Sequence, residues 1–451
     1  MNDLLQDASQ RAAAYLDSLP GRRAFPTPED LAGLRHLAVP LQDEPIDPRL
    51  VLRELDAHGS PAATASAGGR YFGFVIGGSL PAAVAASFLA AAWDQNAGLK
   101  ATSPLAAALE EVAASWLIDV LGLPSGSGVG FVTAATTANF VGLAAARHTV
   151  LERSGWDVES KGLFGAPPIT VVVGEEVHAS VLKALSMLGL GRERVLRVAV
   201  DGRGRMRPDA FPEISAPAIV CTQAGNVNTG EADPFEDLIP RAHAAGAWVH
   251  VDGAFGLWAA ACPTRAHLVR GVGGADSWAL DAHKWLNVPY DSGLVFVRSE
   301  QALREAMAIR AAYLIEGAAR EPCFGTPELS RRARGTEVWS ALRSLGRRGL
   351  AELIERCCRH ASRFAEGLTA AGHLVLTPVV LNQVLVSFGS EAETQAVIRR
   401  VQEDGTCWCG GTVWQGKAAM RISVSSWATT DEDVEVSLRA ILRCAQGAGA
   451  G

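Results

Sequence analysis

The stretch Ala247-Trp-Val-His-Val-Asp-Gly-Ala254 decides the fold class. Residues 248–252 are mostly β-branched or aromatic, so they predict a buried strand that ends at a carboxylate. A helix is expected before this strand, at residues 234–245, and further apolar strands are expected at 218–222 and 277–281. Nearly continuous apolar strands that alternate with helices form sheets that are covered on both faces. The pattern therefore predicts an α/β fold with a mainly parallel sheet.

This alternation extends over residues 78–340, which we expect to form one large domain. Its other expected strands lie at residues 130–133, 169–174, 194–200 and 294–298, and its other expected helices at 105–121, 137–153 and 179–188. Residues 1–77 are predicted to be a helical segment that begins with an amphipathic helix from Asp3 to Leu19. Residues 341–451 are predicted to form a small α+β domain. Its expected helices lie at 349–371 and 431–445, and its expected strands at 383–388 and 420–424.

The composition restricts the class of protein. Of 451 residues, 48% are hydrophobic and 20% are charged, which is typical of a folded chain rather than a disordered one. The 41 basic and 48 acidic residues give a formal net charge of −7, which disfavours bulk nucleic-acid binding. The longest uncharged run, from Tyr71 to Trp93, is interrupted at Pro81, and the N-terminus carries acidic residues early. We therefore expect a cytoplasmic protein without nucleic-acid or membrane partners.

The cysteines and histidines do not follow a metal-binding pattern. The pairs Cys407-Trp-Cys409 and Cys357-Cys358 have no second pair at zinc spacing, and no H-E-x-x-H motif occurs. Eight cysteines in a chain of this length do not indicate a disulfide framework. Buried structural thiols and no metal site are expected.

Three chemically distinctive residues, His178, Asp252 and Lys284, each lie at or shortly after the end of an expected strand. The carboxyl ends of the strands in open α/β sheets are where ligands bind, so we expect these side chains to share a site. Lys284 is either a desolvated amine that forms a Schiff base or a surface lysine. Asp252 either pairs with a cationic ring nitrogen or caps the following turn. His178 either stacks on a cofactor ring or is a surface histidine before a helix.

A phosphate site is expected where residues 132–139, Val-Thr-Ala-Ala-Thr-Thr-Ala-Asn, pass from a strand into a helix. The small residues allow close approach of the backbone. The hydroxyls of Thr136 and Thr137, with the amides of the helix N-terminus, are suited to bind a phosphate dianion. The alternative is that a threonine only caps the helix.

Taken together, these motifs resemble the group II pyridoxal-5′-phosphate (PLP) decarboxylases, the family of aromatic-L-amino-acid and glutamate decarboxylases. The resemblance extends from about Arg70 to Ser437. The motifs that carry it are Arg70-Tyr-Phe-Gly-Phe74, Ser103-Pro104 with Glu110, Val132 to Asn139, Val177-His-Ala-Ser180, Ala224-Gly-Asn-Val-Asn-Thr-Gly230, His250-Val-Asp-Gly-Ala254, Asp281-Ala-His-Lys284, Ser330-Arg-Arg332 and Arg421-Ile-Ser-Val424.

The resemblance implies the aspartate-aminotransferase-like type I fold, built as a homodimer whose active sites are shared between subunits and whose residues 1–77 contact the partner. It also implies the roles of the site residues. Lys284 forms the internal aldimine, Asp252 pairs with the pyridine nitrogen, and His178 stacks on the ring. The other cofactor-binding residues that it implies are Thr136, Thr137, Thr222, Ala254, Asp281, His283 and, from the partner subunit, the turn at Ser330.

The activity that the resemblance implies is decarboxylation of an L-amino acid to its amine through external aldimine and quinonoid intermediates, with Tyr313 returning a proton to the α-carbon. An aromatic substrate is favoured. Phe72 and Phe74 either contact it or belong to the core, and Arg421 either contacts the substrate carboxylate or faces solvent. The alternatives are decarboxylation of an acidic or other non-aromatic amino acid, and oxygen-dependent aldehyde synthesis. A catalytically silent binding protein and a phosphate-dependent enzyme without an imine are further alternatives.

Two departures from the aromatic-decarboxylase pattern concern substrate specificity. Asp281-Ala282 stands where those enzymes have Asn-Pro, and the loop from Phe74 to Ser79 is shorter by about one residue. Neither departure removes a residue that is expected to attach the cofactor.

Overall fold

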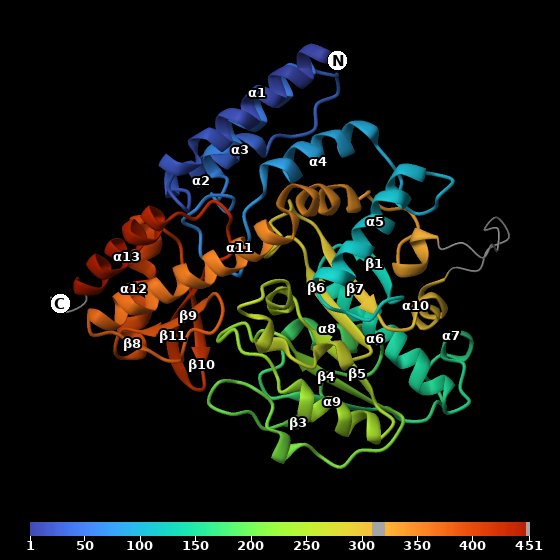
Figure 1. Cartoon of the computed structure of the whole chain (residues 1–451). Helices are drawn as coiled ribbons and strands as arrows, with labels where there is room; N and C mark the ends of the chain where they lie inside the picture. Colours follow the sequence, from blue (N-terminus) through green and yellow to red (C-terminus); the bar gives the residue numbers. More distant parts are fainter. Residues whose placement is uncertain (309–320, 448–451) are drawn as a thin grey trace. The chain divides into compact units, whose positions relative to one another are not determined.

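The computed structural model describes residues 1–308 and 321–447 (Figure 1). By contacts between residues, the chain divides into two compact units. One comprises residues 1–78, 360–376 and 384–451, and the other comprises residues 79–359 and 377–383. The division into segments 1–77, 78–340 and 341–451 stays a prediction. Among the described residues, no helix is both long and apolar enough to cross a membrane.

The larger unit is built on a seven-stranded sheet with the strand order β1-β7-β6-β5-β4-β2-β3. The strands are β1 (Gly128–Val132), β2 (Thr170–Gly174), β3 (Leu196–Val198), β4 (Ala218–Gln223), β5 (Trp248–Asp252), β6 (Ser277–Asp281) and β7 (Gly293–Val297). All are mutually parallel except β7, which is antiparallel to both β6 and β1. The predicted α/β class with a mainly parallel sheet is confirmed, and β5 and β6 have the predicted bounds.

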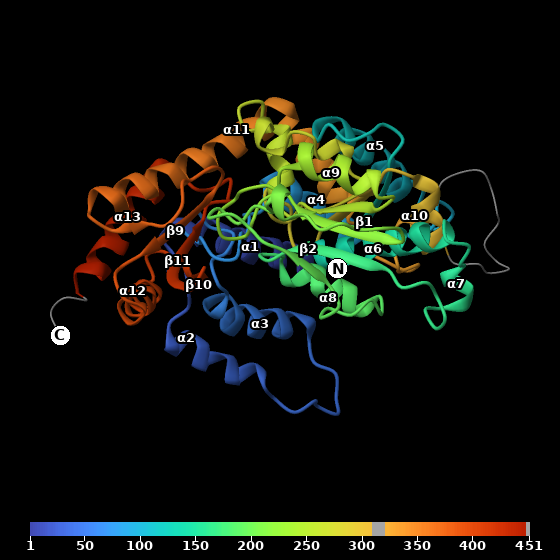
Figure 2. The ribbon, with the colours of Figure 1, turned by 90° about the horizontal axis from the view of Figure 1, so that it is seen from below.

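The helices of this unit cover the sheet on both faces. They are α4 (Pro81–Trp93), α5 (Pro104–Val120), α6 (Ala135–Glu152), α7 (Val158–Lys161), α8 (Ala179–Met187), α9 (Phe235–Ala244), α10 (Glu300–Met307) and most of α11 (Gly335–Ala370). Figure 2 shows α6 and α8 on one side of the sheet and α9 on the other. Side chains of a strand alternate between faces, so every second residue of a covered strand meets the same helix layer.

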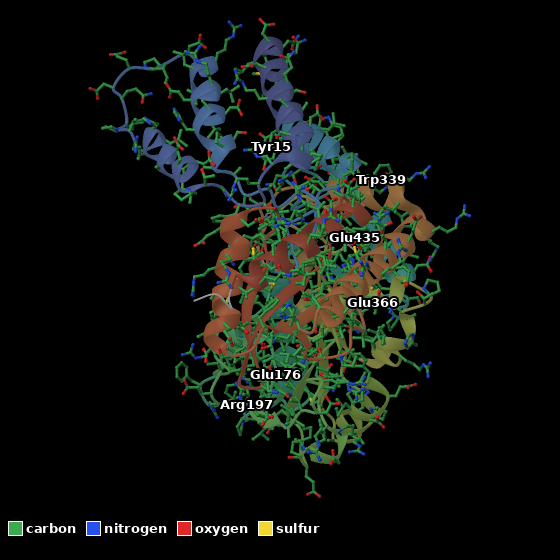
Figure 3. The ribbon with its side chains drawn as sticks, turned by 90° about the vertical axis from the view of Figure 1, so that its left-hand side faces the viewer. Tyr15, Glu176, Arg197, Trp339, Glu366 and Glu435 are labelled. Carbon is green, nitrogen blue, oxygen red and sulfur yellow. The ribbon has the colours of Figure 1, made fainter. Side chains whose placement is uncertain are left out.

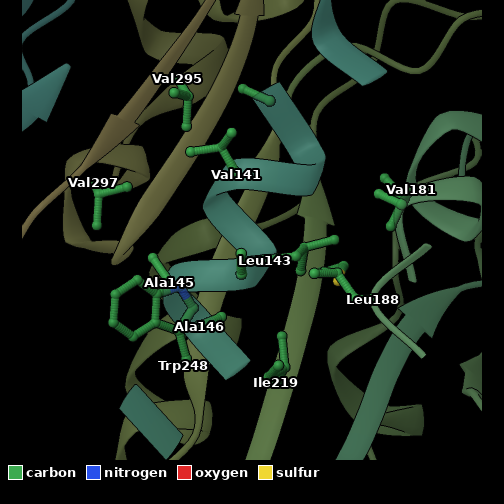
Figure 4. Packing of buried hydrophobic residues seen from close by; sticks show 14 of the residues in the cluster. Val141, Leu143, Ala145, Ala146, Val181, Leu188, Ile219, Trp248, Val295 and Val297 are labelled. Atoms are coloured by element: carbon green, nitrogen blue, oxygen red, sulfur yellow. The ribbon is translucent and has the colours of Figure 1, made fainter. Parts of the chain in front are cut away.

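One large hydrophobic core cluster lies between the sheet and α6, with further residues from α8 and α10 (Figure 4). Val141 and Ala145 of α6 belong to the same cluster as Trp248, Ile219 and Val295 on three different strands. Eleven of the 18 residues of α6 are buried, which explains why its sequence shows no clear amphipathic period. This burial fixes the helix on the sheet and thereby the position of its first turn.

The smaller unit is of the predicted α+β type, with a helical N-terminus. Its sheet has the order β10-β11-β9-β8. Its elements are α1 (Asn2–Ser18), α2 (Pro28–Gly33), α3 (Pro48–Ala62), β8 (Leu374–Val375), β9 (Gln383–Ser387), α12 (Glu391–Asp404), β10 (Gly410–Trp414), β11 (Lys417–Ser423) and α13 (Asp431–Gln446). Arg363, near the end of α11, pairs with Glu435 of α13 at 2.6 Å (Glu435 is labelled in Figure 3).

One predicted helix boundary is wrong. The sequence predicts a helix over residues 349–371, whereas α11 already begins at Gly335. Gly346 interrupts it with φ of 61° and ψ of −179°, so α11 consists of two helical pieces. Only glycine adopts this conformation readily, and the interruption separates the piece that was predicted from the piece that was missed.

Candidate active site

Four segments bring the candidate residues to one edge of the large sheet. Asp252 is the last residue of β5, Lys284 follows β6, His178 precedes α8 after β2, and Thr136 lies in the first turn of α6 after β1. The strands β2, β5 and β6 are parallel, and β1 runs in the same direction as β6 because β7 is antiparallel to both. Their carboxyl ends therefore face the same edge, where ligands bind in open α/β sheets.

Asp252 is a buried carboxylate, and each of its two oxygens accepts hydrogen bonds from neutral groups. Its Oδ1 accepts a hydrogen bond from the backbone N–H of Ala254 at 3.2 Å. Its Oδ2 accepts from Asn139 Nδ2 and from Ser180 Oγ, both at 3.2 Å. Among residues 1–308 and 321–447, no arginine, lysine or histidine forms an ion pair with it. A buried carboxylate without a cation is costly, so a ligand with a cationic N–H fits this position.

His178 lies at the opening of a small pocket. The ring is exposed, and its Nδ1 accepts the backbone N–H of Ser180 at 3.2 Å, so the ring caps α8 as well as facing the site. Together with Thr222 and Asp252 it lines a pocket with about 230 Å³ of empty space, part of which is open to solvent. Ala254 is partly buried, and its carbonyl accepts the N–H of Asp281 at 2.9 Å. Three predicted cofactor-binding residues thus share one pocket.

The amine of Lys284 pairs with Asp281. Its Nζ lies 3.1 Å from Asp281 Oδ2, and its side chain is 19% exposed. Asp281 Oδ1 accepts the N–H of Ala135, the first residue of α6, at 2.6 Å. His283 Nε2 lies 3.6 Å from the same oxygen, and burial lowers the pKa of this histidine. Because a carboxylate only accepts hydrogen bonds, Asp281 links the lysine to the helix N-terminus.

The two threonines lie inside the first turn of α6. The N-cap is Ala134, which offers no side-chain hydrogen bond, so neither threonine is the cap. Thr137 Oγ1 lies 2.8 Å from Thr133 Oγ1, and Thr136 is partly exposed. The first-turn amides and hydroxyls other than the N–H of Ala135, which Asp281 accepts, form a suitable cradle for an anion. The residues present therefore fit the phosphate of PLP.

The predicted site residue Ser330 is not brought to this edge by any contact among the described residues. Ser330 is exposed and its Oγ accepts from Asn96 Nδ2 at 3.2 Å. Tyr313 lies outside the described residues. The roles proposed for both stay predictions.

The predicted substrate-binding residues lie in the smaller unit. Phe72 is buried and packs edge-on against Phe364, with ring centroids 5.1 Å apart, as a core residue does. Phe74 is 61% exposed and stacks on Trp408 at 5.3 Å. Arg421, on β11, is partly buried, and this burial lowers the pKa of its guanidinium. Of these three residues, Phe74 presents the most surface to a ligand.

The sequence did not reveal the groups that hold Asp252. Asn139 and Ser180 lie in motifs that were quoted from the sequence, but no functional role was predicted for them. No functional role was predicted for His250 or Ser277 either. All four are buried. The available signal was a polar side chain inside an otherwise apolar strand, as at His250, because a buried polar group needs a partner.

One cluster with metal-binding residue types lies on α6, α7 and α10. His148 Nδ1 lies 2.7 Å from Glu159, and its Nε2 lies 2.9 Å from Glu305 and 3.7 Å from Glu152. The hydrogen bond to Glu159 is the main cause that raises the pKa of His148 to about 9. Both ring nitrogens of His148 then carry protons and donate hydrogen bonds to carboxylates. The cluster therefore consists of ion pairs between His148 and its glutamates.

Comparisons with known proteins find relatives by sequence and by fold. The family model "Pyridoxal-dependent decarboxylase conserved domain" matches residues 36–390. An aromatic-L-amino-acid decarboxylase of Bacillus atrophaeus is 27% identical over 82% of this chain and 80% of its own. A histidine decarboxylase of Drosophila melanogaster is 28% identical over 94% of this chain and 52% of its own. The crystal structure of Oryza sativa TDC with PLP and tryptamine has a TM-score of 0.90 at 22% identity, over 99% of this chain and 97% of that one, and shows the same fold.

Proposed function

This chain belongs to the family of pyridoxal-dependent decarboxylases, and we propose that it removes the α-carboxylate of an aromatic L-amino acid and releases the corresponding amine. The family establishes the coarser activity, which is PLP-dependent decarboxylation of an amino acid by a carboxy-lyase. The observation that carries the proposal is the pocket lined by His178, Thr222 and Asp252, at the sheet edge where Lys284 and the first turn of α6 also lie.

Each residue of this site has a distinct task. Lys284 supplies the amine that attaches the cofactor, while Thr136 and Thr137 bind its phosphate at the N-terminus of α6. Bound there, PLP supplies an electron sink for the bonding electrons that the departing carboxylate leaves behind. Asp252 holds a negative charge that stabilises a protonated ring nitrogen, and its buried surroundings strengthen that interaction.

Two further residues act on the substrate. His178, at the opening of the pocket, orients the substrate carboxylate. The bond between the α-carbon and the carboxylate is then perpendicular to the plane of the cofactor ring. The hydroxyl of Tyr313 returns a proton to the substrate α-carbon, which completes amine formation. A tyrosine at this position favours simple decarboxylation over oxygen-dependent aldehyde synthesis.

The preference for an aromatic substrate has two supports. The Bacillus atrophaeus relative is named an aromatic-L-amino-acid decarboxylase. The exposed ring of Phe74, stacked on Trp408, offers a planar apolar surface of the kind that binds aromatic side chains. Other relatives, from Bos taurus and Homo sapiens, are named acidic amino acid decarboxylases, so an acidic or other non-aromatic amino acid is the alternative substrate.

The attachment residue is tested with Lys284→Ala and the control Lys183→Ala, which changes an exposed lysine on α8. After reduction with borohydride, peptide mass spectrometry should find PLP on Lys284 in the wild-type and control proteins. The Lys284→Ala protein should carry no covalent cofactor and form no amine. Cofactor attached elsewhere, with full activity, would remove Lys284 from this role.

The substrate is tested by incubating the PLP-loaded protein with separate amino acids and measuring carbon dioxide, amine, aldehyde and oxygen uptake. Amine from tryptophan, tyrosine or phenylalanine, without oxygen uptake, supports the proposal. Amine from acidic amino acids alone, or aldehyde with oxygen consumption, would contradict the substrate or the reaction.

We also propose a homodimer with shared active sites, in which residues 1–77 contact the partner. The helices α1, α2 and α3 bury none of their residues within this chain. They expose the apolar side chains of Leu5, Leu16, Leu31, Leu50, Val51 and Leu55. Apolar surface of this extent is covered in most stable proteins, and the predicted Ser330 contact also needs a second subunit. Sedimentation equilibrium should give twice the chain mass, and a monomer with full activity would contradict the proposal.

A further inference from the structure

A continuous chain of buried hydrogen bonds leads from Trp248 to Asp252. Trp248 Nε1 donates to Ser277 Oγ at 2.8 Å, and Ser277 Oγ lies 2.8 Å from His250 Nδ1. His250 Nε2 lies 2.8 Å from Asn139 Oδ1, and Asn139 Nδ2 donates to Asp252 Oδ2 at 3.2 Å. All five residues are buried, three of them completely. The chain connects β5, β6 and α6 to the carboxylate at the site.

The chemistry of the two ends fixes the bond that Trp248 donates and the direction of the bonds between His250 and Asp252. An indole N–H can only donate, so Ser277 Oγ accepts from Trp248 and its own proton is available for His250 Nδ1. An ionised carboxylate can only accept, so the Asn139 amide must point its NH₂ group at Asp252. The amide oxygen of Asn139 then faces His250 Nε2, which must carry the proton. The Asp252 end thus requires this tautomer of His250, and a serine that accepts from Trp248 is compatible with it.

The surroundings keep this ring neutral and in place. Burial is the main cause that lowers the pKa of His250 to about 4, so the ring stays uncharged at neutral pH. The absence of a side chain at Gly142 of α6 lets the helix approach the ring, because a Cβ atom there would lie 2.8 Å from His250 Cε1. A neutral ring with one donor and one acceptor matches the two partners that it contacts.

We propose that His250 is a positioning residue for Asp252, and that its Nε2–H group orients Asn139 so that the amide donates to the carboxylate. The inference rests on the proposed function in one respect, because it assumes that Asp252 pairs with the ring nitrogen of PLP. Every donor in the chain points toward Asp252. Donors aimed at a carboxylate restrict its rotation, and an acceptor held in place is what a protonated ring nitrogen requires.

The first test uses the protein without cofactor, so it does not depend on the proposed function. Histidine labelled with ¹⁵N is observed in two-bond ¹H–¹⁵N spectra, and His250 is assigned by its loss in His250→Gln. The expected tautomer carries its proton on Nε2. Ser277→Ala should shift the Nδ1 resonance toward that of an unbonded nitrogen, whereas Ser437→Ala, a buried serine on α13, should not. A proton on Nδ1, or no response to Ser277→Ala, would overturn the proposal.

The second test asks whether the chain reaches the cofactor. PLP labelled with ¹⁵N at its pyridine nitrogen reports directly whether that nitrogen is protonated. His250→Gln keeps one donor and one acceptor, whereas His250→Leu keeps neither. We expect His250→Leu to weaken PLP binding by about tenfold to a hundredfold and to reduce ring-nitrogen protonation, because hydrogen bonds to charged groups have this strength. His250→Gln should restore both measurements substantially.

The two tests separate the possible failures. If both variants lose stability equally while the pyridine resonance of the bound cofactor is unchanged, His250 is only a packing residue and the proposal is wrong. If the wild-type protein takes up no PLP, the proposed function fails, and the tautomer measurement still decides whether the hydrogen-bond chain is directed as inferred.

Discussion

The buried pair Glu110–Arg331 gives the sharpest stability prediction. Arg331 Nη1 and Nη2 contact the two oxygens of Glu110 at 2.6 and 2.9 Å, and the side chains are 2% and 3% exposed. Arg331 Nε has no hydrogen-bond partner among the described residues, so Glu110 is the main counter-charge. Replacing Glu110 with alanine leaves a guanidinium buried and unpaired. The expected loss in the free energy of unfolding is about 3–5 kcal/mol.

The neighbouring residue on α5 provides the control. Glu111 pairs with Lys100 at 2.8 Å, but these side chains are 48% and 40% exposed. Glu111→Ala should therefore cost less than about 1 kcal/mol. The two variants share the helix, the residue type and the substitution. They therefore differ only in how deeply the replaced side chain is buried.

The assay is urea unfolding of the cofactor-free proteins, followed by tryptophan fluorescence and circular dichroism. A double variant, Glu110→Leu with Arg331→Met, removes both charges and should regain most of the stability, because no ion is then left unpaired. The reasoning would be refuted if Glu110→Ala and Glu111→Ala lost equal stability. It would also be refuted if the double variant were less stable than Glu110→Ala.

Two further predictions concern α6. The raised pKa of His148, about 9, means that its ion pairs stabilise the folded chain fully below the ordinary value of 6.5 and cease to do so as the pH rises through about 9. His148→Gln should therefore cost about 1 kcal/mol near pH 6 and almost nothing above pH 9, as measured by urea unfolding; a pH-independent difference would contradict this. Gly142→Ala should cost about 1–3 kcal/mol because its Cβ would lie 2.8 Å from the His250 ring. Gly349→Ala, a helical glycine whose Cβ would meet Leu345 at 3.5 Å, should be neutral or slightly stabilising in the same assay.

The sequence by itself determined the elements and the chemistry at their ends. The apolar runs at Trp248–Asp252 and Ser277–Asp281 became strands with the predicted bounds. A strand in a covered sheet is apolar along its whole length, and this is a local property that a short window of sequence contains. The residues at or after the ends of such strands face the ligand edge, which is why the sequence predicts Asp252 and Lys284 as site residues.

Tertiary structure alone decided the direction of β7 and the partners of polar groups. The run that forms β7 resembles its neighbours in sequence, yet it is antiparallel to both, because direction depends on the connection and not on the residues. Asn139 donates to Asp252 from 113 positions earlier in the chain. A hydrogen bond of this kind has no sequence period, since it arises only after the core has fixed α6 on the sheet.

Asp281 shows the same limit at the centre of the site. It lies close to Lys284 in the sequence, and the resemblance implied that it binds the cofactor. In the folded chain its carboxylate joins the Lys284 amine to the N–H of Ala135. Which donors meet a carboxylate depends on where a helix from another part of the chain begins, and packing rather than local sequence sets that position.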